Sequence, residues 1–232
     1  MTQGSYKQFC PVAMASEVLC TRWTILVLRE MLMGSTRFND LRRGLSRMSP
    51  ALLSQRLKDL EEAGVVRRVA TPNDPSVHEY HLTQAGKELL PLIEGLGSWG
   101  HRWVESEVSL QHLDAQLLMW DMRRRLDTRP LPKKRSNIEF LFPDAPANQR
   151  KWWLVVEPDG CVDLCGVDPG FDVNLYVSTD LRTMTAIWMG LDKLSAAVKS
   201  ERVLLTGDAK LKDDMNSWLG YSTFATVDRI AS

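Results

Sequence analysis

Four side chains between Ser49 and Gly64 have the types and the spacing needed to read DNA base edges. If this stretch is helical, Ala51, Ser54, Gln55 and Lys58 fall on one face. A glutamine pairs bidentately with adenine, and a lysine reaches guanine or a phosphate. A serine adapts its contacts, whereas an alanine touches only a thymine methyl group. These four side chains are candidate DNA contacts.

The element that must position them is an amphipathic helix beginning at Pro50. Ser49 supplies a hydroxyl N-cap, Pro50 suits a first helical position that needs no amide donor, and Gly64 marks the end. The opposite face is apolar and carries Leu53, Leu57 and Leu60. Residues 38–45 predict a preceding short helix and residues 46–48 a tight turn. Such a pair is a helix-turn-helix whose second helix enters a major groove, and the alternative is a helix pair in an ordinary core.

A hairpin is expected directly after this helix. Residues 65–69 are rich in β-branched side chains, residues 71–75 have turn chemistry, and residues 77–82 form a second strand-like run. Arginines near the base of the hairpin can contact the DNA backbone. We therefore predict a winged helix-turn-helix. Its candidate DNA-binding residues are Arg37, Ser49, Ala51, Ser54, Gln55, Lys58, Arg67, Arg68 and His78.

Charge is distributed unevenly along the 232 residues, although the formal net charge is zero. Residues 20–68 carry ten Lys and Arg against five Asp and Glu, whereas residues 152–232 carry seven against twelve. A basic segment that coincides with the helix-turn-helix favours a nucleic-acid partner, and the alternative is a solvated surface. The apolar content of 44% suffices for the cores of one large or two small domains.

The sequence offers little for catalysis or metal binding. The four histidines, His78, His81, His101 and His112, lack metal-ligand spacing with any cysteine or carboxylate pair. Cys161 and Cys165 share a strand face without a second ligand pair, so we expect buried free thiols there. There is no phosphate-binding glycine loop and no arrangement of serine, histidine and acid. We expect a protein that is not an enzyme and holds no cofactor or metal.

The sequence predicts a cytoplasmic protein. No segment reaches the ~18 continuous apolar residues of a membrane span, and the first ten residues lack the basic and apolar regions of a signal peptide. We therefore expect no membrane contact. The four cysteines should be reduced and should form no disulfide framework.

Further helices are expected on both sides of the helix-turn-helix. Residues 11–19 and 21–32 predict two of them, and a longer helix is expected from Gln84, capped by Thr83, to about Glu105. This longer helix carries apolar residues at helical spacing: Leu89, Leu92, Ile93, Leu96, Trp99 and Trp103. A long apolar helix needs a partner, and the same helix of a second subunit can supply it. We expect a homodimer on a two-fold DNA site.

The first ~105 residues resemble the HxlR-type winged helix-turn-helix regulators, a branch near the MarR regulators. The matching features are Cys10-Pro11-Val12, Arg22-Trp23-Thr24, Leu28, Leu32, Gly34, Arg37-Phe38, Leu41, Ser49-Pro50, Leu53 to Leu57, Leu60, Gly64, Glu79-Tyr80, Leu82-Thr83, Gly86 and Trp99. The resemblance implies a dimeric bacterial or archaeal transcription factor, with the hairpin at residues 72–78 near the minor groove or backbone. Ala51 and Val77 stand where the family usually has basic residues. Each lost phosphate contact lowers the salt slope by about 0.9, so we expect a shallower salt dependence.

Cys10 occupies a position that serves as a thiol sensor for oxidants or quinones in some HxlR-type regulators. At the amino terminus of a helix, unpaired amides and the helix dipole stabilise a thiolate and lower the thiol pKa. The resemblance therefore makes Cys10 a candidate redox sensor. The alternative is that Cys10 packs at a dimer interface and senses nothing.

The pattern becomes mixed α and β after residue 109. Residues 109–126 predict a helix, and residues 127–136, with two prolines and a basic run, predict an exposed linker that is solvated or touches flanking phosphates. Strands are expected at 138–142, 152–157, 160–167, 173–178 and 202–206, and helices at 181–189, 191–199 and 210–219. This alternation predicts an α+β layer domain.

Residues 136–227 resemble the sterol-carrier-protein-like fold. The resemblance rests on Trp152 to Val156, Gly160 to Cys165, Asp168, Asp172, Trp188 to Gly190 and Leu205 to Asp208. It implies a five-stranded sheet covered by helices, with an apolar ligand between them. The candidate pocket residues are Trp153, Met184, Trp188, Leu191 and Leu194. The alternative is that these side chains simply fill a core.

The sequence thus predicts an α+β protein in three parts. Residues 1–108 form a winged helix-turn-helix for DNA binding and dimerisation, residues 109–135 a helix and basic linker, and residues 136–232 a sterol-carrier-protein-like domain. The leading hypothesis is a homodimeric DNA-binding regulator whose second domain senses an apolar small molecule. The alternatives are a redox regulator acting through Cys10, and a lipid-handling second domain with the DNA-binding half as its partner module.

Overall fold

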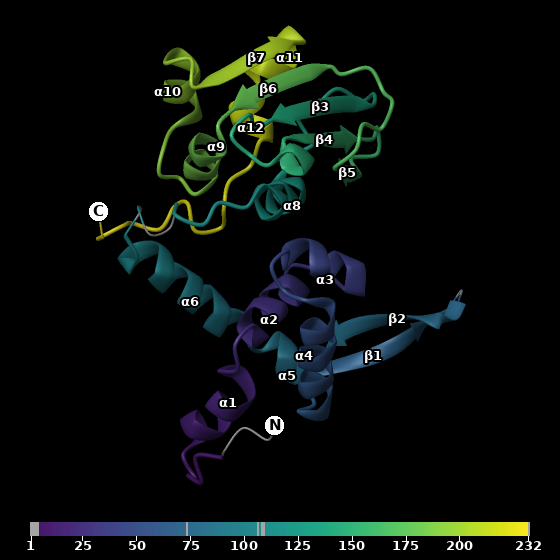
Figure 1. The fold of residues 1–232 in the computed structure, drawn as a ribbon, viewed down its shortest axis with the longest axis vertical. Coiled ribbons are helices and arrows are strands. Elements are labelled where there is room, and N and C mark those ends of the chain that lie inside the picture. The colour runs from purple at the N-terminus through teal and green to yellow at the C-terminus, as the bar shows by residue number, and fades with distance from the viewer. Residues whose placement is uncertain (1–4, 73, 106, 108–109, 232) are drawn as a thin grey trace. The chain divides into compact units, whose positions relative to one another are not determined.

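The computed structural model of the protein describes residues 5–72, 74–105, 107 and 110–231. The chain divides into two compact units, residues 1–97 and 98–232. Helices and a β-hairpin form the first unit, and a five-stranded sheet with helices forms the second (Figure 1). The predicted α+β class is therefore confirmed.

Four helices precede the hairpin in the first unit. They are α1 (Pro11–Leu19), α2 (Thr24–Leu32), α3 (Phe38–Gly44) and α4 (Pro50–Glu62). Proline begins α1 and α4, where its missing N–H costs no hydrogen bond. Gly34 and Gly64 follow α2 and α4 with φ of 96° and 72°, a left-handed conformation that glycine adopts without strain.

The hairpin consists of two antiparallel strands. They are β1 (Val66–Thr71) and β2 (Asp74–Leu82). Val66 pairs with Leu82 at the base. The expected turn residue Asn73 lies outside the described residues. A bridge between Arg37 and Glu79 joins the segment before α3 to β2, which holds the hairpin against the helices.

The single helix expected over residues 84–105 is wrong. The structure has α5 (Gln84–Lys87) and α6 (Leu90–Trp103) instead. Pro91 explains the break, because it has no N–H to donate to the carbonyl of Lys87, four residues earlier, and its ring would clash with that carbonyl in a continuous helix. Thr83 caps α5 as expected, since its hydroxyl accepts from the Gly86 amide at 3.3 Å.

The core of the first unit is made by α2, α3, α4 and the start of the hairpin. Its buried residues are Val27, Leu28, Met31, Leu41, Leu45, Met48, Leu53, Leu57, Leu60, Val65 and Val66. Leu89, just before α6, and Ile93, in its first turn, pack against this core. The leucines expected to face inward on α4 therefore do so.

The second unit begins within α6 and continues with α8 (Ala115–Arg125). Asp114 caps this helix, because its carboxylate accepts from the Leu117 amide at 3.0 Å. The helix therefore begins later than the expected residue 109, which lies outside the described residues together with residue 108. Buried side chains of α8 join the core under the sheet.

The five-stranded sheet has the order β5-β4-β3-β6-β7. Its strands are β3 (Ser136–Leu141), β4 (Lys151–Val156), β5 (Val162–Cys165), β6 (Leu175–Thr179) and β7 (Val203–Gly207), with the 3-10 turn η1 (Ala147–Gln149) before β4. Strand β3 pairs parallel with β6, and the other neighbours pair antiparallel. All five expected strands are present.

Four more helices follow β6 and β7. They are α9 (Leu181–Trp188), α10 (Leu194–Lys199), α11 (Ala209–Asp213) and α12 (Met215–Trp218). The single helix expected over residues 210–219 is therefore two short ones, which meet at Asp214. The helix expected from residue 191 begins at Leu194 instead.

One face of this sheet and its helices share a single core. The core includes Trp152, Leu154, Val156, Ile138, Phe140, Leu175, Val177, Met184, Ile187, Trp188, Leu211 and Trp218. The opposite face of β3 and β4 is also covered in part, because the Asn137 amide nitrogen donates to the Phe171 carbonyl at 2.9 Å. Phe171 belongs to the connection from β5 to β6, so this connection crosses that face.

No single helix among the described residues is long and apolar enough to cross a membrane. Only α1 and α2 together reach the necessary length and composition, and they are bent by 83° at their junction.

Candidate nucleic-acid interface

Helix α4 presents the predicted base-reading side chains to solvent. Ser49 caps it, with its hydroxyl accepting from the Leu52 amide at 3.3 Å. Buried Leu53, Leu57 and Leu60 fix the opposite face. The exposed residues are Ala51, Ser54, Gln55 and Lys58. The burial of the leucines thus orients the whole helix about its axis.

A chain of hydrogen bonds links Gln55 to the turn between α1 and α2. The Gln55 amide nitrogen Nε2 donates to Asp59 Oδ1 at 2.7 Å, and Arg56 Nη1 donates to Asp59 Oδ2 at 2.7 Å. Arg56 Nε donates to the Arg22 carbonyl at 3.1 Å. The sequence prediction did not include Asp59 or Arg56, although Asp59 follows Gln55 by four residues, a spacing at which helix side chains meet.

The hairpin carries a second polar surface. Arg67 and Arg68 of β1 are exposed, and Arg68 Nη2 lies 3.1 Å from His78 Nδ1 on β2. A guanidinium only donates, so Nδ1 accepts in this contact. His78 Nδ1 also lies 3.2 Å from the Ser76 carbonyl, which only accepts. The contact to Arg68 therefore requires the tautomer with its proton on Nε2.

Arg37 is held at the edge of the hairpin. Its Nε lies 3.2 Å from Glu79 Oε1, and its side chain remains 63% exposed. The other oxygen of Glu79 lies 3.2 Å from His81 Nε2. Arg37 is therefore oriented by a carboxylate, yet it keeps enough exposed surface for a contact with DNA.

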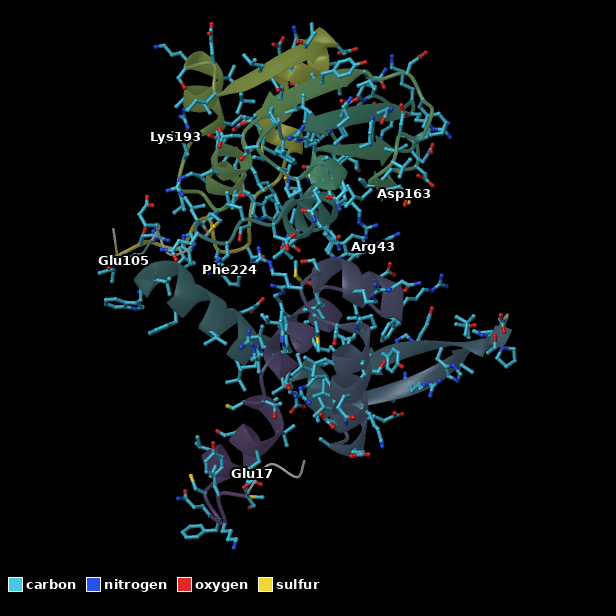
Figure 2. The ribbon with its side chains drawn as sticks, viewed as in Figure 1. Glu17, Arg43, Glu105, Asp163, Lys193 and Phe224 are labelled. Atoms are coloured by element: carbon cyan, nitrogen blue, oxygen red, sulfur yellow. The ribbon has the colours of Figure 1, made fainter. Side chains whose placement is uncertain are left out.

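A buried carboxylate lies where α2 meets α3. Glu30 is fully buried and pairs with Arg29 Nη2 at 2.6 Å. The same Nη2 donates to the Gly44 carbonyl at 3.0 Å. A Cβ at Gly44 would lie 2.0 Å from Glu30 carboxylate atoms. A methyl group at Gly44 would therefore require the Glu30 carboxylate to move from its place beside Arg29. Gly44 ends α3, and its neighbour Arg43 is labelled in Figure 2.

Cys10 lies at the N-cap of α1 and is exposed. It makes no capping hydrogen bond. The amides of Ala13 and Val12 nevertheless lower its pKa from the usual thiol value, because they favour the thiolate. The acidic side chain of Glu17, labelled on the same helix in Figure 2, instead accepts from the Ser5 hydroxyl and the Tyr6 amide.

No disulfide joins any of the four cysteines, all of which lie in the described part of the chain, and two of them lie at the edge of the sheet in the second unit. Cys161 is exposed and Cys165 is half-buried, so the burial expected for both is wrong, because β5 is an edge strand of the sheet. Among the described residues, no group of three histidines, cysteines or carboxylates could hold a metal ion.

The structure does not bring all five predicted pocket residues together. Met184, Trp188 and Leu194 are buried in the common core, and Leu191 is partly exposed nearby in sequence. Trp153 is buried but lies outside that core. Strand alternation puts its side chain on the opposite face from Trp152 and Leu154.

Basic residues in the last turn of α8 and after it have partners within the second unit. Arg123 and Arg124 lie over the Trp120 ring at 4.3 Å and 4.9 Å from its centroid. Arg129 pairs with Asp127 and holds the pKa of that carboxyl at about 2. Arg135 pairs with Glu157 at 2.9 Å. These contacts join residues of the second unit to one another, and the Arg129 side chain remains 89% exposed.

Comparison with known proteins identifies the first unit. A family model described as HxlR-like helix-turn-helix matches residues 18–108. YvaP of Bacillus subtilis, an uncharacterised HTH-type transcriptional regulator, is 37% identical over 99 residues, which are 42% of this chain and 92% of that protein. The chain belongs to the HxlR-like helix-turn-helix family. Members of this family are transcriptional regulators, and membership implies DNA binding.

Other relatives match the same part of the chain. Rv3095 of Mycobacterium tuberculosis, an uncharacterised HTH-type transcriptional regulator, is 43% identical over 93 residues, and the match spans 40% of this chain and 58% of that protein. The solved structure of the reduced transcriptional regulator YodB from B. subtilis is 27% identical, covers 40% of this chain and 92% of that chain, and has a TM-score of 0.35. The family match to residues 18–108 contains α3, α4 and the hairpin.

Proposed function

We propose that this HxlR-like regulator binds a two-fold DNA site as a homodimer, with α4 in the major groove and the hairpin on the backbone. The observation that carries the proposal is the exposure of Ser54, Gln55 and Lys58 on a helix whose other face is anchored by buried leucines. Exposed arginines on β1 add positive charge beside it, as phosphate contacts require.

A stripe of exposed apolar side chains on α6 supports the dimer. Leu92, Leu96, Trp99 and Trp103 follow helical spacing and are 64%, 51%, 59% and 49% exposed. Helix α1 adds exposed apolar residues, of which Val12 is 72% exposed. Aligned apolar side chains of this size on a helix mark an interaction surface. The same helices of a second copy would cover both surfaces in an isologous interface.

The proposed dimer can be tested by placing a charged side chain in the apolar stripe of α6. Leu96→Glu should give a monomer in analytical ultracentrifugation and lose DNA affinity, because both half-sites are no longer read together. Leu204→Glu is the matched control, since Leu204 is 53% exposed on β7 of the second unit. A Leu96→Glu protein that stays dimeric would overturn the proposed interface.

The DNA-reading surface is tested by two alanine variants on duplexes selected from a random pool. Gln55→Ala should relax base preference, whereas Arg68→Ala should weaken all duplexes alike and reduce the salt slope by about 1. If neither variant changed binding to the selected duplexes, the placement of the recognition helix would be wrong.

We further propose that the second unit, which resembles the sterol-carrier-protein-like fold, senses an apolar small molecule. The supporting observation is the methionine content of its core. Buried methionines there are Met119, Met122, Met184 and Met215, and Met189 packs at the rim. Methionine is unbranched and repacks readily, so such a core can open around an apolar guest. Ligand binding would shift the population of DNA-competent dimers.

Mass spectrometry of an organic extract of the purified full-length protein tests this proposal. We expect a small apolar compound that changes DNA affinity when titrated back. Met184→Phe should reduce its binding by filling space in the core, whereas Leu204→Phe, on the exposed face of β7, should not. An empty extract, with no effect of added fatty acid or sterol on DNA binding, would overturn the sensing role.

A second candidate function is redox regulation through Cys10. The exposure of this thiol and its lowered pKa favour reaction with oxidants or quinones. If Cys10 is the sensor, an oxidant should lower the DNA affinity of the wild-type protein and leave that of Cys10→Ser unchanged. Cys20→Ser, at another exposed thiol, is the control. Equal loss of affinity in wild type and Cys10→Ser would exclude this function.

A further inference from the structure

We infer that Asp59 is a positioning residue that sets the orientation of the Gln55 amide and so determines the base preference of α4. The inference rests on the proposed reading of DNA by this helix. Its basis is the pair of 2.7 Å contacts that Asp59 makes with Gln55 Nε2 and Arg56 Nη1.

A glutamine amide has two ends that are alike in shape and opposite in hydrogen bonding. Bidentate pairing with adenine needs the carbonyl oxygen to accept from N6 and the NH₂ group to donate to N7. A rotation by 180° about the last side-chain bond exchanges the two ends and loses this match. The base preference of Gln55 therefore depends on which way its amide faces.

Asp59 allows only one of these two orientations. An ionised carboxylate only accepts hydrogen bonds, so the end of Gln55 that faces Asp59 must be the NH₂ group. One of its two hydrogens goes to Asp59 Oδ1, at 2.7 Å between the heavy atoms. The second hydrogen and the oxygen Oε1 remain for a base edge, which is the pair of groups that adenine requires.

Arg56 in turn fixes the carboxylate. It occupies Asp59 Oδ2, leaving Oδ1 for Gln55, and its own Nε is tied to the Arg22 carbonyl at 3.1 Å. The Arg56 side chain is only 17% exposed, whereas that of Asp59 is 43% exposed. A largely buried anchor on the turn between α1 and α2 therefore positions a carboxylate at the surface, and the carboxylate orients the base-reading amide.

The same helix provides a matched control. Glu62 pairs with Lys58 at 3.6 Å and is 66% exposed. Removing either Asp59 or Glu62 deletes one negative charge from the exposed side of α4, so both deletions should strengthen binding to random DNA to a similar extent. Only the deletion of Asp59 frees the amide of Gln55. A difference between the two variants therefore reports orientation and not charge.

The experiment selects duplexes from a random pool with the full-length protein and with four variants, Gln55→Ala, Asp59→Ala, Glu62→Ala and the double variant of Gln55 and Asp59. We expect wild type and Glu62→Ala to show about a tenfold preference for adenine at one position of each half-site. Gln55→Ala and Asp59→Ala should each lose that preference at the same position. The double variant should lose no more than either single one.

Three outcomes would contradict the inference, and they can be told apart. If Gln55→Ala loses the preference but Asp59→Ala keeps it, the orienting role of Asp59 is wrong while the proposed DNA reading stands. If Asp59→Ala loses preference at every position alike, Asp59 is structural. If Gln55→Ala changes no position, the proposed placement of α4 fails as well.

Discussion

The two units of this protein differ in whether the side chains that suggest a function are exposed or buried. In the first unit, the side chains that suggest a function, such as Gln55 and Arg68, are exposed and the leucines behind them are buried. In the second unit, the side chains that suggested a pocket, such as Met184 and Trp188, are buried in the core. Exposed polar residues at fixed spacing indicate chemistry, whereas buried apolar residues indicate packing and leave function open.

The largest expected effect is a loss of folding stability that is confined to the second unit. Trp218 is fully buried, and its Nε1 donates to the Leu211 carbonyl at 2.8 Å. Trp218→Ala should cost about 3–5 kcal/mol, because it opens a cavity and leaves that carbonyl unpaired. Hydrogen exchange should show faster exchange in β3 and β6 peptides. If α4 peptides lost protection equally, the two units would not be independent in stability.

A somewhat smaller effect is expected at the junction of α2 and α3. Gly44→Ala places a methyl group against the buried Glu30 carboxylate and should destabilise the first unit by ~2–3 kcal/mol, measured by urea unfolding. The matched control in the second unit is Gly166→Ala. Its Cβ would meet only the Trp152 ring at 3.5 Å, an ordinary contact. A cost at Gly166 as large as that at Gly44 would contradict the geometry described here.

Helix caps allow a finer comparison between the units. Asp180 caps α9 by accepting from the Thr183 amide at 2.7 Å and also from the Thr183 hydroxyl at 2.7 Å. Ser49 caps α4 through one longer contact of 3.3 Å. Asp180→Ala should cost about 1–2 kcal/mol and Ser49→Ala about 0.5–1 kcal/mol, as measured by urea unfolding. The reverse order would mean that cap geometry does not govern their contributions.

The smallest expected effect concerns the reactivity of Cys10. Its pKa is lowered in the folded chain, so the thiolate is present at lower pH than in the unfolded chain. Alkylation of Cys10 by iodoacetamide near pH 7.5, followed by peptide mass spectrometry, should be faster in the native protein than in urea. The rate should rise with pH towards a plateau. Equal rates in both states would show that the amides of α1 do not activate this thiol.

Most elements of the fold could be predicted from local patterns. Ser49-Pro50 and Gly64 bracket α4 because capping hydroxyl, proline and glycine act through their own backbone geometry. The strands were expected from β-branched and apolar runs bounded by turn residues, and all five strands of the sheet are present. The errors came from a neglected proline, since Pro91 divides the helix expected over residues 84–105, and from helix ends such as Asp214, which boundary signals define poorly.

The candidate interface could be predicted only in part. Exposure of Gln55 and Lys58 follows from the spacing of the leucines on the opposite face. The salt bridge between Arg37 and Glu79 joins residues forty-two positions apart, and no local pattern reveals it. Asp59 was within reach of prediction, because residues four apart meet on a helix surface. The role of Arg56 was not, because its partner is a backbone carbonyl of another segment.

The α+β class, the helix-turn-helix and the residues that α4 exposes could all be predicted without the structure, because these features follow from periodicity and from the backbone preferences of single residues. The fold is needed to show that Trp153 lies on the other face of the sheet from the core, that a methyl group at Gly44 would meet the Glu30 carboxylate, and that Arg56 ties α4 to the turn at Arg22. These features depend on which segments meet and in what register, and contacts between distant segments are fixed by packing and not by local sequence.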